Sequence, residues 1–152
     1  ARKYLYITSP YLIIDDSMVS ALKLAAKGGV DVRIITPHNG DKKFVHDTTR
    51  TYYKELILSG VKIYEFNGFI HSKTFVCDDM TATVGTINLD FRSMYLHYEC
   101  GVWLHEAQAV MEVKQRFLQE IESSFIITEQ TCKDRHFNSL GRNILRLVAP
   151  LM

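Results

Sequence analysis

Apolar and polar residues alternate with two different periods along the first 60 positions of the chain. Residues 3–8 (KYLYIT) and 30–36 (VDVRIIT) follow the two-residue period of a strand. Residues 15–27 and 41–58 repeat their apolar side chains near the 3.6-residue period of a helix. Strands and helices that alternate in this way predict β–α units and an α/β sheet rather than a bundle or a sandwich.

The second half of the chain predicts closely spaced strands followed by two helices. The strands are expected at residues 61–66, 69–77, 82–85 and 95–104. The helices are expected at residues 106–125 and 137–152, and the second should turn Leu147 inward and Arg146 outward. No linker or low-complexity segment divides these elements, so residues 1–152 are expected to form a single domain.

Composition narrows the function classes. A chain of 152 residues can bury about 70% of its unfolded surface in one core. Its 18 basic and 17 acidic residues nearly cancel, so the charge balance disfavours nucleic acid as a partner and any charge effect must be local. No apolar run approaches the roughly 20 residues that cross a bilayer. Cys77, Cys100 and Cys132 lack a CxxC spacing, and the first two are expected in strands as small apolar residues.

One strand-like stretch, GFIHSKTFVCD at residues 68–78, places a histidine and a lysine two positions apart. Side chains at 71 and 73 of a strand point to the same face. His71 and Lys73 therefore form either a solvated face or a site. Each residue alone is more often an ordinary surface residue, and the sequence downstream decides between the two interpretations.

That downstream sequence completes the pattern H-x-K-x4-D-x6-G-[ST]-x-N. Its members are His71, Lys73, Asp78, Gly85, Thr86 and Asn88. The pattern resembles the signature of the phospholipase D superfamily. Residues 6–11, 25–33, 60–65, 84–93 and 149–152 further resemble the C-terminal half of bacterial cardiolipin synthases, so the resemblance runs from end to end. It implies an α-β-α sandwich with a mixed central sheet flanked by helices, forming one lobe of a larger two-lobed enzyme.

The signature residues suit phosphodiester chemistry. A neutral imidazole can attack phosphorus, which makes His71 the candidate nucleophile or the general acid that opposes it. Lys73 offers a point charge to nonbridging phosphate oxygens. Asn88 and Thr86 can donate hydrogen bonds to the same oxygens, although both residues also favour turns for structural reasons. This set needs no metal or other cofactor, because Lys73 and Asn88 already supply charge stabilisation.

Three more positions enter through the resemblance. It implies that Glu99, on a neighbouring strand, holds the second nitrogen of His71; an ion pair with Arg92 or Arg33 is the alternative. Asp78 belongs to the catalytic signature, but it follows Lys73 by five residues at a turn, so we expect it to lie far from the phosphate. His97 stands where the family usually has Asn and introduces a titratable group near the site.

The resemblance implies phosphatidyl transfer between two phosphatidylglycerol molecules, giving cardiolipin and glycerol through a phosphohistidine. It also implies a second motif, supplied by an N-terminal lobe or a second copy of this chain, and work at the bacterial cell membrane, with anchoring segments outside this chain. Two alternatives remain open. One is a homodimeric, single-motif nuclease, which the near-neutral charge disfavours. The other is a lobe that binds anionic lipid without turnover.

Overall fold

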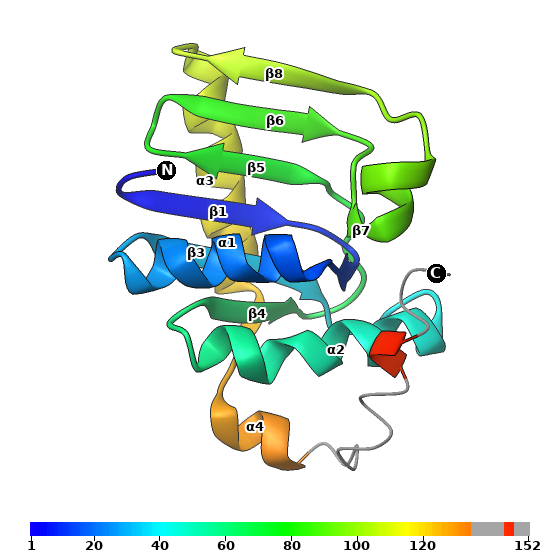
Figure 1. Cartoon of the computed structure of the whole chain (residues 1–152). Coiled ribbons are helices and arrows are strands. Elements are labelled where there is room, and N and C mark those ends of the chain that lie inside the picture. The colour runs from blue at the N-terminus through cyan, green and yellow to red at the C-terminus, as the bar shows by residue number, and fades with distance from the viewer. Residues whose placement is uncertain (135–144, 148–152) are drawn as a thin grey trace.

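The computed structural model describes residues 1–134 and 145–147, which form an α/β structure around a mixed sheet (Figure 1). The strands are β1 (Tyr4–Thr8), β2 (Leu12–Ile13), β3 (Asp31–Pro37), β4 (Lys62–Phe66), β5 (Thr74–Cys77), β6 (Thr81–Gly85), β7 (Leu89–Asp90), β8 (Gly101–His105) and β9 (Ser124–Ile127). The helices are α1 (Asp16–Lys27), α2 (Lys43–Ile57), α3 (Gln108–Glu122), α4 (Glu129–Asp134) and a π-helical turn, η1 (Arg92–Leu96).

Within the described residues the main sheet has seven strands in the order β8-β6-β5-β1-β3-β4-β9. The pairs β1–β3 and β3–β4 are parallel, and the other neighbours are antiparallel. Parallel strands need crossover connections, and α1 and α2 supply them. The expected mixed sheet with flanking helices is therefore confirmed.

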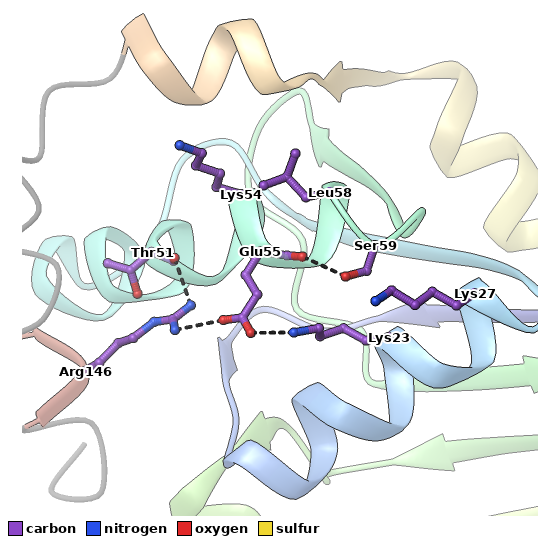
Figure 2. Close-up of a pocket in the computed structure, with 8 residues that line it drawn as sticks. All are labelled: Lys23, Lys27, Thr51, Lys54, Glu55, Leu58, Ser59 and Arg146. Carbon is purple, nitrogen blue, oxygen red and sulfur yellow. Dashed lines mark hydrogen bonds and ion pairs between the residues drawn. The ribbon is translucent and has the colours of Figure 1, made fainter.

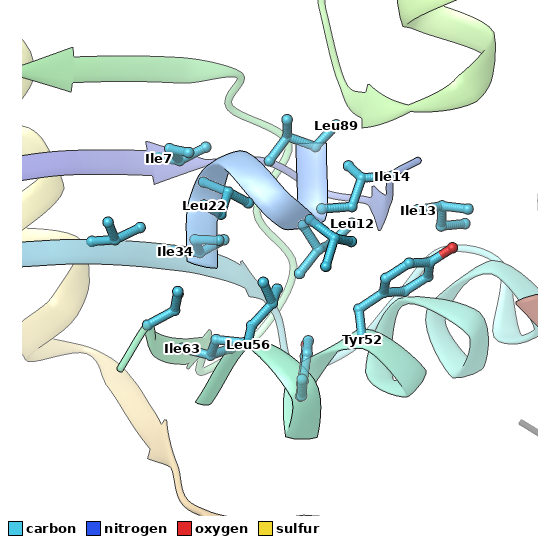
Figure 3. Packing of buried hydrophobic residues seen from close by; sticks show 14 of the residues in the cluster. Ile7, Leu12, Ile13, Ile14, Leu22, Ile34, Tyr52, Leu56, Ile63 and Leu89 are labelled. Atoms are coloured by element: carbon cyan, nitrogen blue, oxygen red, sulfur yellow. The ribbon is translucent and has the colours of Figure 1, made fainter. Parts of the chain in front are cut away.

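One hydrophobic cluster lies between the sheet and helices α1 and α2. Ile7 of β1 and Ile34 of β3 meet Leu22 of α1 and Leu56 of α2 there, and all four are almost fully buried (Figure 3). The short β2–β7 pair contributes further apolar side chains to the same cluster. This shared core holds the two β–α units together.

A second cluster covers the opposite face, where α3 lies behind the sheet in Figure 1. Tyr4 and Tyr6 alternate with Leu5 and Ile7 along β1, so they face α3 instead of α1 and α2. The ring of Tyr6 stacks on Phe117 of α3 at a centroid distance of 4.8 Å. Both faces of β1 are thus covered, as expected for a central strand.

Helix α1 begins directly after Asp15, in the stretch whose apolar period predicted a helix. Asp15 adopts an extended backbone and its side chain accepts a hydrogen bond from Met18 N at 2.8 Å. This is the N-cap interaction, which satisfies one of the free amides of the first helical turn. No helix within the described ranges is both long and apolar enough to cross a membrane.

Several sequence-based boundaries were wrong. Strand β5 begins at Thr74, not at 69, and the segment expected as a strand at 95–104 contains the end of η1 before β8 begins at Gly101. Strands β2 and β7 were missed because two-residue strands carry no period.

The expected C-terminal helix lies largely outside the described residues, which include only 145–147 of it. There Leu147 is 81% exposed, whereas Arg146 packs over Tyr52 and pairs with Glu55. The inward and outward assignment of these two residues was therefore wrong.

Candidate active site

The topology gathers four distant segments at one edge of the sheet. Antiparallel pairing sets Thr8, at the end of β1, opposite Thr74, at the start of β5. The next pairs set Thr74 opposite Val84 and Gly85 opposite Gly101. The residues just before β5, just after β6 and just before β8 therefore meet at the edge where β1 ends. The segment before β5 carries His71 and Lys73 of the signature, and the segment after β6 carries Thr86 and Asn88.

A hollow of about 470 Å³ opens at this edge. Four of the predicted site residues line it: His71, Lys73, Thr86 and Asn88. His71 is exposed to solvent, and its ring stacks against Phe69 at a centroid distance of 5.5 Å. An accessible imidazole beside a cation and an amide matches what phosphoryl transfer requires.

His71 and Lys73 both line the hollow, as predicted. Neither lies on a strand, however, so the alternation of side chains along a strand does not explain their shared position. Both precede β5 and lie on no assigned helix or strand. Lys73 bends back so that its Nζ donates a hydrogen bond to the carbonyl oxygen of His71 at 2.7 Å. The Lys73 carbonyl accepts from Gly85 N at 3.2 Å, which continues the β5–β6 pairing by one residue.

Lys73 is a half-buried cation among acidic neighbours. Burial lowers the pKa of its ammonium below the usual 10.5, while the charges of Glu99, Asp41 and Asp90 act to raise it. An incoming phosphate would add negative charge beside a lysine that has already lost part of its hydration. The interaction is therefore stronger than at a fully solvated lysine.

Glu99 is brought to the site, but its carboxylate is bonded to Thr86 and not to His71. Thr86 Oγ1 donates to Glu99 Oε2, and the same hydroxyl accepts from Cys100 N at 3.0 Å. Hydrogen bonds from Thr86 and Ser93 lower the pKa of Glu99. Neither ion pair considered from the sequence forms, since Arg33 pairs with Asp31 and Arg92 is exposed. Glu99 and Cys100 precede β8 and do not lie on a strand.

Asn88 presents an unsatisfied polar atom toward the site. Its Nδ2 donates to Ser93 Oγ at 3.3 Å, and its buried Oδ1 has no hydrogen-bond partner within the described residues. A buried amide oxygen without a partner is costly, so such a group usually has a ligand in the working state. A half-turn of the amide would direct Nδ2 to that position, but Ser93 could then donate to Oδ1 only by releasing Glu99, to which its hydroxyl proton is bonded.

Gly85 allows β6 and β8 to approach closely. A Cβ placed at Gly85 would lie 2.4 Å from the Cys100 carbonyl oxygen and 2.6 Å from Gly101 Cα. Real Cβ atoms do not make contacts this short with backbone, so only glycine fits. The close approach is what brings Glu99 and Cys100 to Thr86.

Asp78 lies at the other end of β5, in the β5–β6 turn, and is absent from the lining of the hollow. Its backbone is left-handed, with φ of 57°. Its carboxylate accepts from the amides of Arg2, Lys3 and Tyr4 at 2.6, 2.8 and 3.0 Å. The residue anchors the start of β1, as expected for a position far from the phosphate.

Sequence reasoning missed several residues around the site. Ser93 binds both Asn88 and Asp90, and Asp41 acts electrostatically on Lys73. Nothing in a single sequence links residues 41 and 73, because their proximity depends on the order of the strands. His97 does reach the site: its Nδ1 lies 3.9 Å from Glu99 Oε1.

A buried ion cluster supports the chain that leads to His71. Glu65, fully buried on β4, accepts from Arg50 Nε at 2.8 Å, and its Oε2 lies 2.7 Å from His38 Nδ1. The amides of His38 and Asn39 then donate to the carbonyls of Phe66 and Gly68. No role was assigned to His38 from the sequence, and its place here is to fix the residues just before the site.

Fold and site together define a phospholipase D-like domain. Residues 1–121 match the family described as "Cardiolipin synthase, PLD-like domain". The chain belongs to this family.

Curated relatives agree with this family. The chain is 40% identical to a cardiolipin synthase of Alkalihalophilus pseudofirmus and 40% identical to cardiolipin synthase 2 of Bacillus anthracis. Both matches include 100% of this chain but only 31% and 30% of the relative. The chain thus spans about a third of the length of the relatives it matches.

Solved structures support the fold at low sequence identity. The phospholipase D family member Nuc of Salmonella typhimurium superposes with a TM-score of 0.69 at 18% identity, over 84% of this chain and 83% of Nuc. A phosphatidylserine synthase of Haemophilus influenzae gives 0.70 at 14% identity, over 98% of this chain and 40% of the synthase. These likenesses concern the fold alone.

Proposed function

We propose that this chain is one catalytic lobe of a phosphatidyl transferase that joins two phosphatidylglycerol molecules into cardiolipin and releases glycerol. The observation that carries the proposal is the shared hollow of His71, Lys73 and Asn88. Relatives named cardiolipin synthase support the choice of substrate. The residues themselves favour phosphodiester chemistry without choosing among phosphodiesters.

In the first half-reaction, His71 or its counterpart in a second lobe attacks the phosphorus of phosphatidylglycerol. The P–N bond forms as the bond from phosphorus to the glycerol oxygen breaks, and the opposing histidine protonates that oxygen. Lys73 and the Asn88 amide stabilise the nonbridging oxygens as their charge grows. In the second half-reaction, a hydroxyl of another phosphatidylglycerol gives its proton to the opposing histidine and attacks phosphorus. The P–N bond then breaks, and cardiolipin leaves.

Glu99 is proposed to act indirectly, by holding the Thr86 hydroxyl and by placing negative charge near Lys73. Its carboxylate fixes the Thr86 hydroxyl and lies within the electrostatic range of Lys73.

The second histidine is proposed to come from another lobe of the same protein or from a second copy of this chain. Around η1 and β8 the surface is unusually apolar: Tyr95, Leu96, Tyr98, Val102 and Trp103 are all more than half exposed. Strand β8 also ends the described part of the sheet, with its outer edge open. An apolar patch beside an open edge is typical of a protein interface, and this one adjoins the hollow.

The test uses the full protein that contains this chain, incubated with phosphatidylglycerol carrying labelled phosphate. Denaturation at neutral pH and peptide mapping should find the phosphoryl group on His71 or on one other histidine. His71→Gln should abolish cardiolipin formation in either case. Turnover without label on any histidine would exclude the covalent route, and hydrolysis of DNA without activity on lipid would favour the nuclease alternative.

A further inference from the structure

A second hollow, of about 500 Å³, lies between α1 and α2 on the face opposite α3 (Figure 2). Its cations are Lys23 and Lys27 of α1, Lys54 of α2 and Arg146 from the C-terminal segment. The described residues that line it include a single carboxylate, Glu55. None of its lining residues lines the hollow at His71, so it is a separate site.

The carboxylate of Glu55 is already committed on both oxygens. Lys23 Nζ binds Oε1 at 2.8 Å, and Arg146 Nη1 binds Oε2 at 3.0 Å, as the dashed lines in Figure 2 mark. The hydrogen bond from Lys23, followed by that from Arg146, lowers the pKa of Glu55 despite burial, so the group stays ionised. Glu55 therefore organises two cations but cannot neutralise four.

Lys27 and Lys54 remain without an ion-pair partner within the described part of the chain. Four positive charges around one negative charge leave an excess of three in a concave site. Helical neighbours of like charge repel one another, and a bound anion relieves that repulsion. The charge pattern calls for an anion with several oxygens, and a phosphate group has this chemistry.

One lining residue of this hollow and two sequence neighbours of its cations are exposed leucines. Leu58, which lines it, is 62% exposed, and Leu24, between Lys23 and Lys27 on α1, is 74% exposed. Leu147, next to Arg146, is 81% exposed. Exposed leucines alternate here with cations, and that combination suits an interface where headgroups meet acyl chains. A soluble phosphate would give the leucines nothing to contact.

We propose that this hollow binds the phosphate of an anionic phospholipid at a bilayer surface, as a docking site separate from the hollow at His71. Lys27 contacts the phosphate, Lys54, which extends in another direction in Figure 2, contacts a neighbouring headgroup, Lys23 and Arg146 are held in place by Glu55, and the leucines enter the interface. The proposal does not depend on catalysis. A lobe without turnover would use the site in the same way.

The test measures sedimentation of the 152-residue chain with vesicles of phosphatidylglycerol in phosphatidylcholine, in a His71→Gln, Lys73→Gln background that weakens the first hollow. The double variant K27Q/K54Q should partition about 10- to 30-fold more weakly, because each basic residue near an anionic surface contributes roughly a factor of five. The matched control K3Q/K43Q removes the same charge from exposed lysines elsewhere and should weaken binding less than about threefold.

A third variant, Glu55→Gln, changes the result in the opposite direction. It frees Lys23 and Arg146 and should strengthen partitioning, whereas an ion pair with a purely structural role predicts only a lower melting temperature. Equal losses in K27Q/K54Q and its control would overturn the proposal. So would inorganic phosphate that binds the hollow at matched ionic strength while phosphatidylglycerol vesicles show no preference over phosphatidylcholine, since the ligand would then be soluble.

Discussion

The two ends of strand β5 carry members of one sequence signature under opposite conditions. At the start of β5, His71 is exposed and Lys73 is partly desolvated beside an amide whose Oδ1 has no partner within the described residues. At the far end, Asp78 is bonded by three backbone amides. At the start of β5, polar groups remain available to a ligand. At the far end, the Asp78 carboxylate is already used in hydrogen bonds that stabilise the fold.

The difference teaches that a signature can join a reaction site to the structural contact that holds it in place. Asp78 ties the first residues of the chain to the β5–β6 turn, and this sets the register of β1 against β5. That register places Thr8 opposite Thr74, at the edge where the hollow opens. Asp78 therefore acts on the site through the sheet, and substitutions at the two ends should separate activity from stability.

The largest expected effect is at the open end. If the proposed function holds, replacing His71 with Gln in the full protein should lower cardiolipin formation by about 10³-fold or more, because either the nucleophile or the opposing acid–base group is lost. The melting temperature should stay within about 2 °C, as for most exposed substitutions. His105→Gln, at an exposed histidine at the end of β8, is the matched control and should retain activity. An active His71→Gln enzyme would refute the assignment of the site.

A substitution at Asp78, at the far end of β5, should lower stability and leave activity nearly unchanged. Asp78→Asn removes the charge that three amides share and should cost about 1–3 kcal/mol of unfolding free energy. Activity per folded molecule should change little, because Asp78 does not line the hollow. Urea denaturation measures the first quantity and turnover at low temperature the second. A loss of turnover comparable to that of His71→Gln, with stability unchanged, would contradict this separation.

The stability that Asp78 contributes should depend on pH. Burial acts to raise the pKa of Asp78, but hydrogen bonds from Tyr4, Lys3 and Arg2 outweigh it, so the pKa lies below 3.8. A carboxylate whose pKa is depressed by folding stabilises the fold above 3.8, and this stabilisation is lost as pH falls through the folded value. The stability gap between the native chain and Asp78→Asn should therefore be full at pH 6 and close below pH 3.8. A gap that widens on acidification would contradict the argument.

The sequence predicted several of the features that separate the two ends of β5. The helix cap at Asp15, the order of β–α units and the distance of Asp78 from the site all follow from local patterns. The partner of Glu99 could not be anticipated, because it depends on the contact of Gly85 with Gly101 across two strands. The position of Arg146 was equally hidden, since its charge pairs with Glu55, 91 residues away. Local periods predict elements, whereas long-range pairing decides which side chains meet.

A smaller effect should appear at Lys73. Because burial lowers the pKa of its ammonium, kcat/KM should begin to fall at a pH below 10.5 as the lysine loses its charge. Lys73→Arg keeps the charge at all accessible pH values and should remove this alkaline limb, at a cost of about tenfold in rate because guanidinium does not fit a site built for an ammonium. Rate profiles between pH 7 and pH 11 measure both. An unchanged alkaline limb in Lys73→Arg would assign the limb to another group.

The smallest effect is expected at His97, which faces Glu99 across 3.9 Å at the open end. Hydrogen bonds from Thr86 and Ser93 lower the pKa of Glu99 more than the charge of His97 does. His97→Asn should therefore change kcat/KM less than about fivefold, the limit set by an exposed ion pair of roughly 1 kcal/mol or less. The change should disappear in a Glu99→Gln background, because the carboxylate that His97 faces is then uncharged. An effect of equal size with and without the Glu99 carboxylate would mean that His97 acts through packing and not through charge.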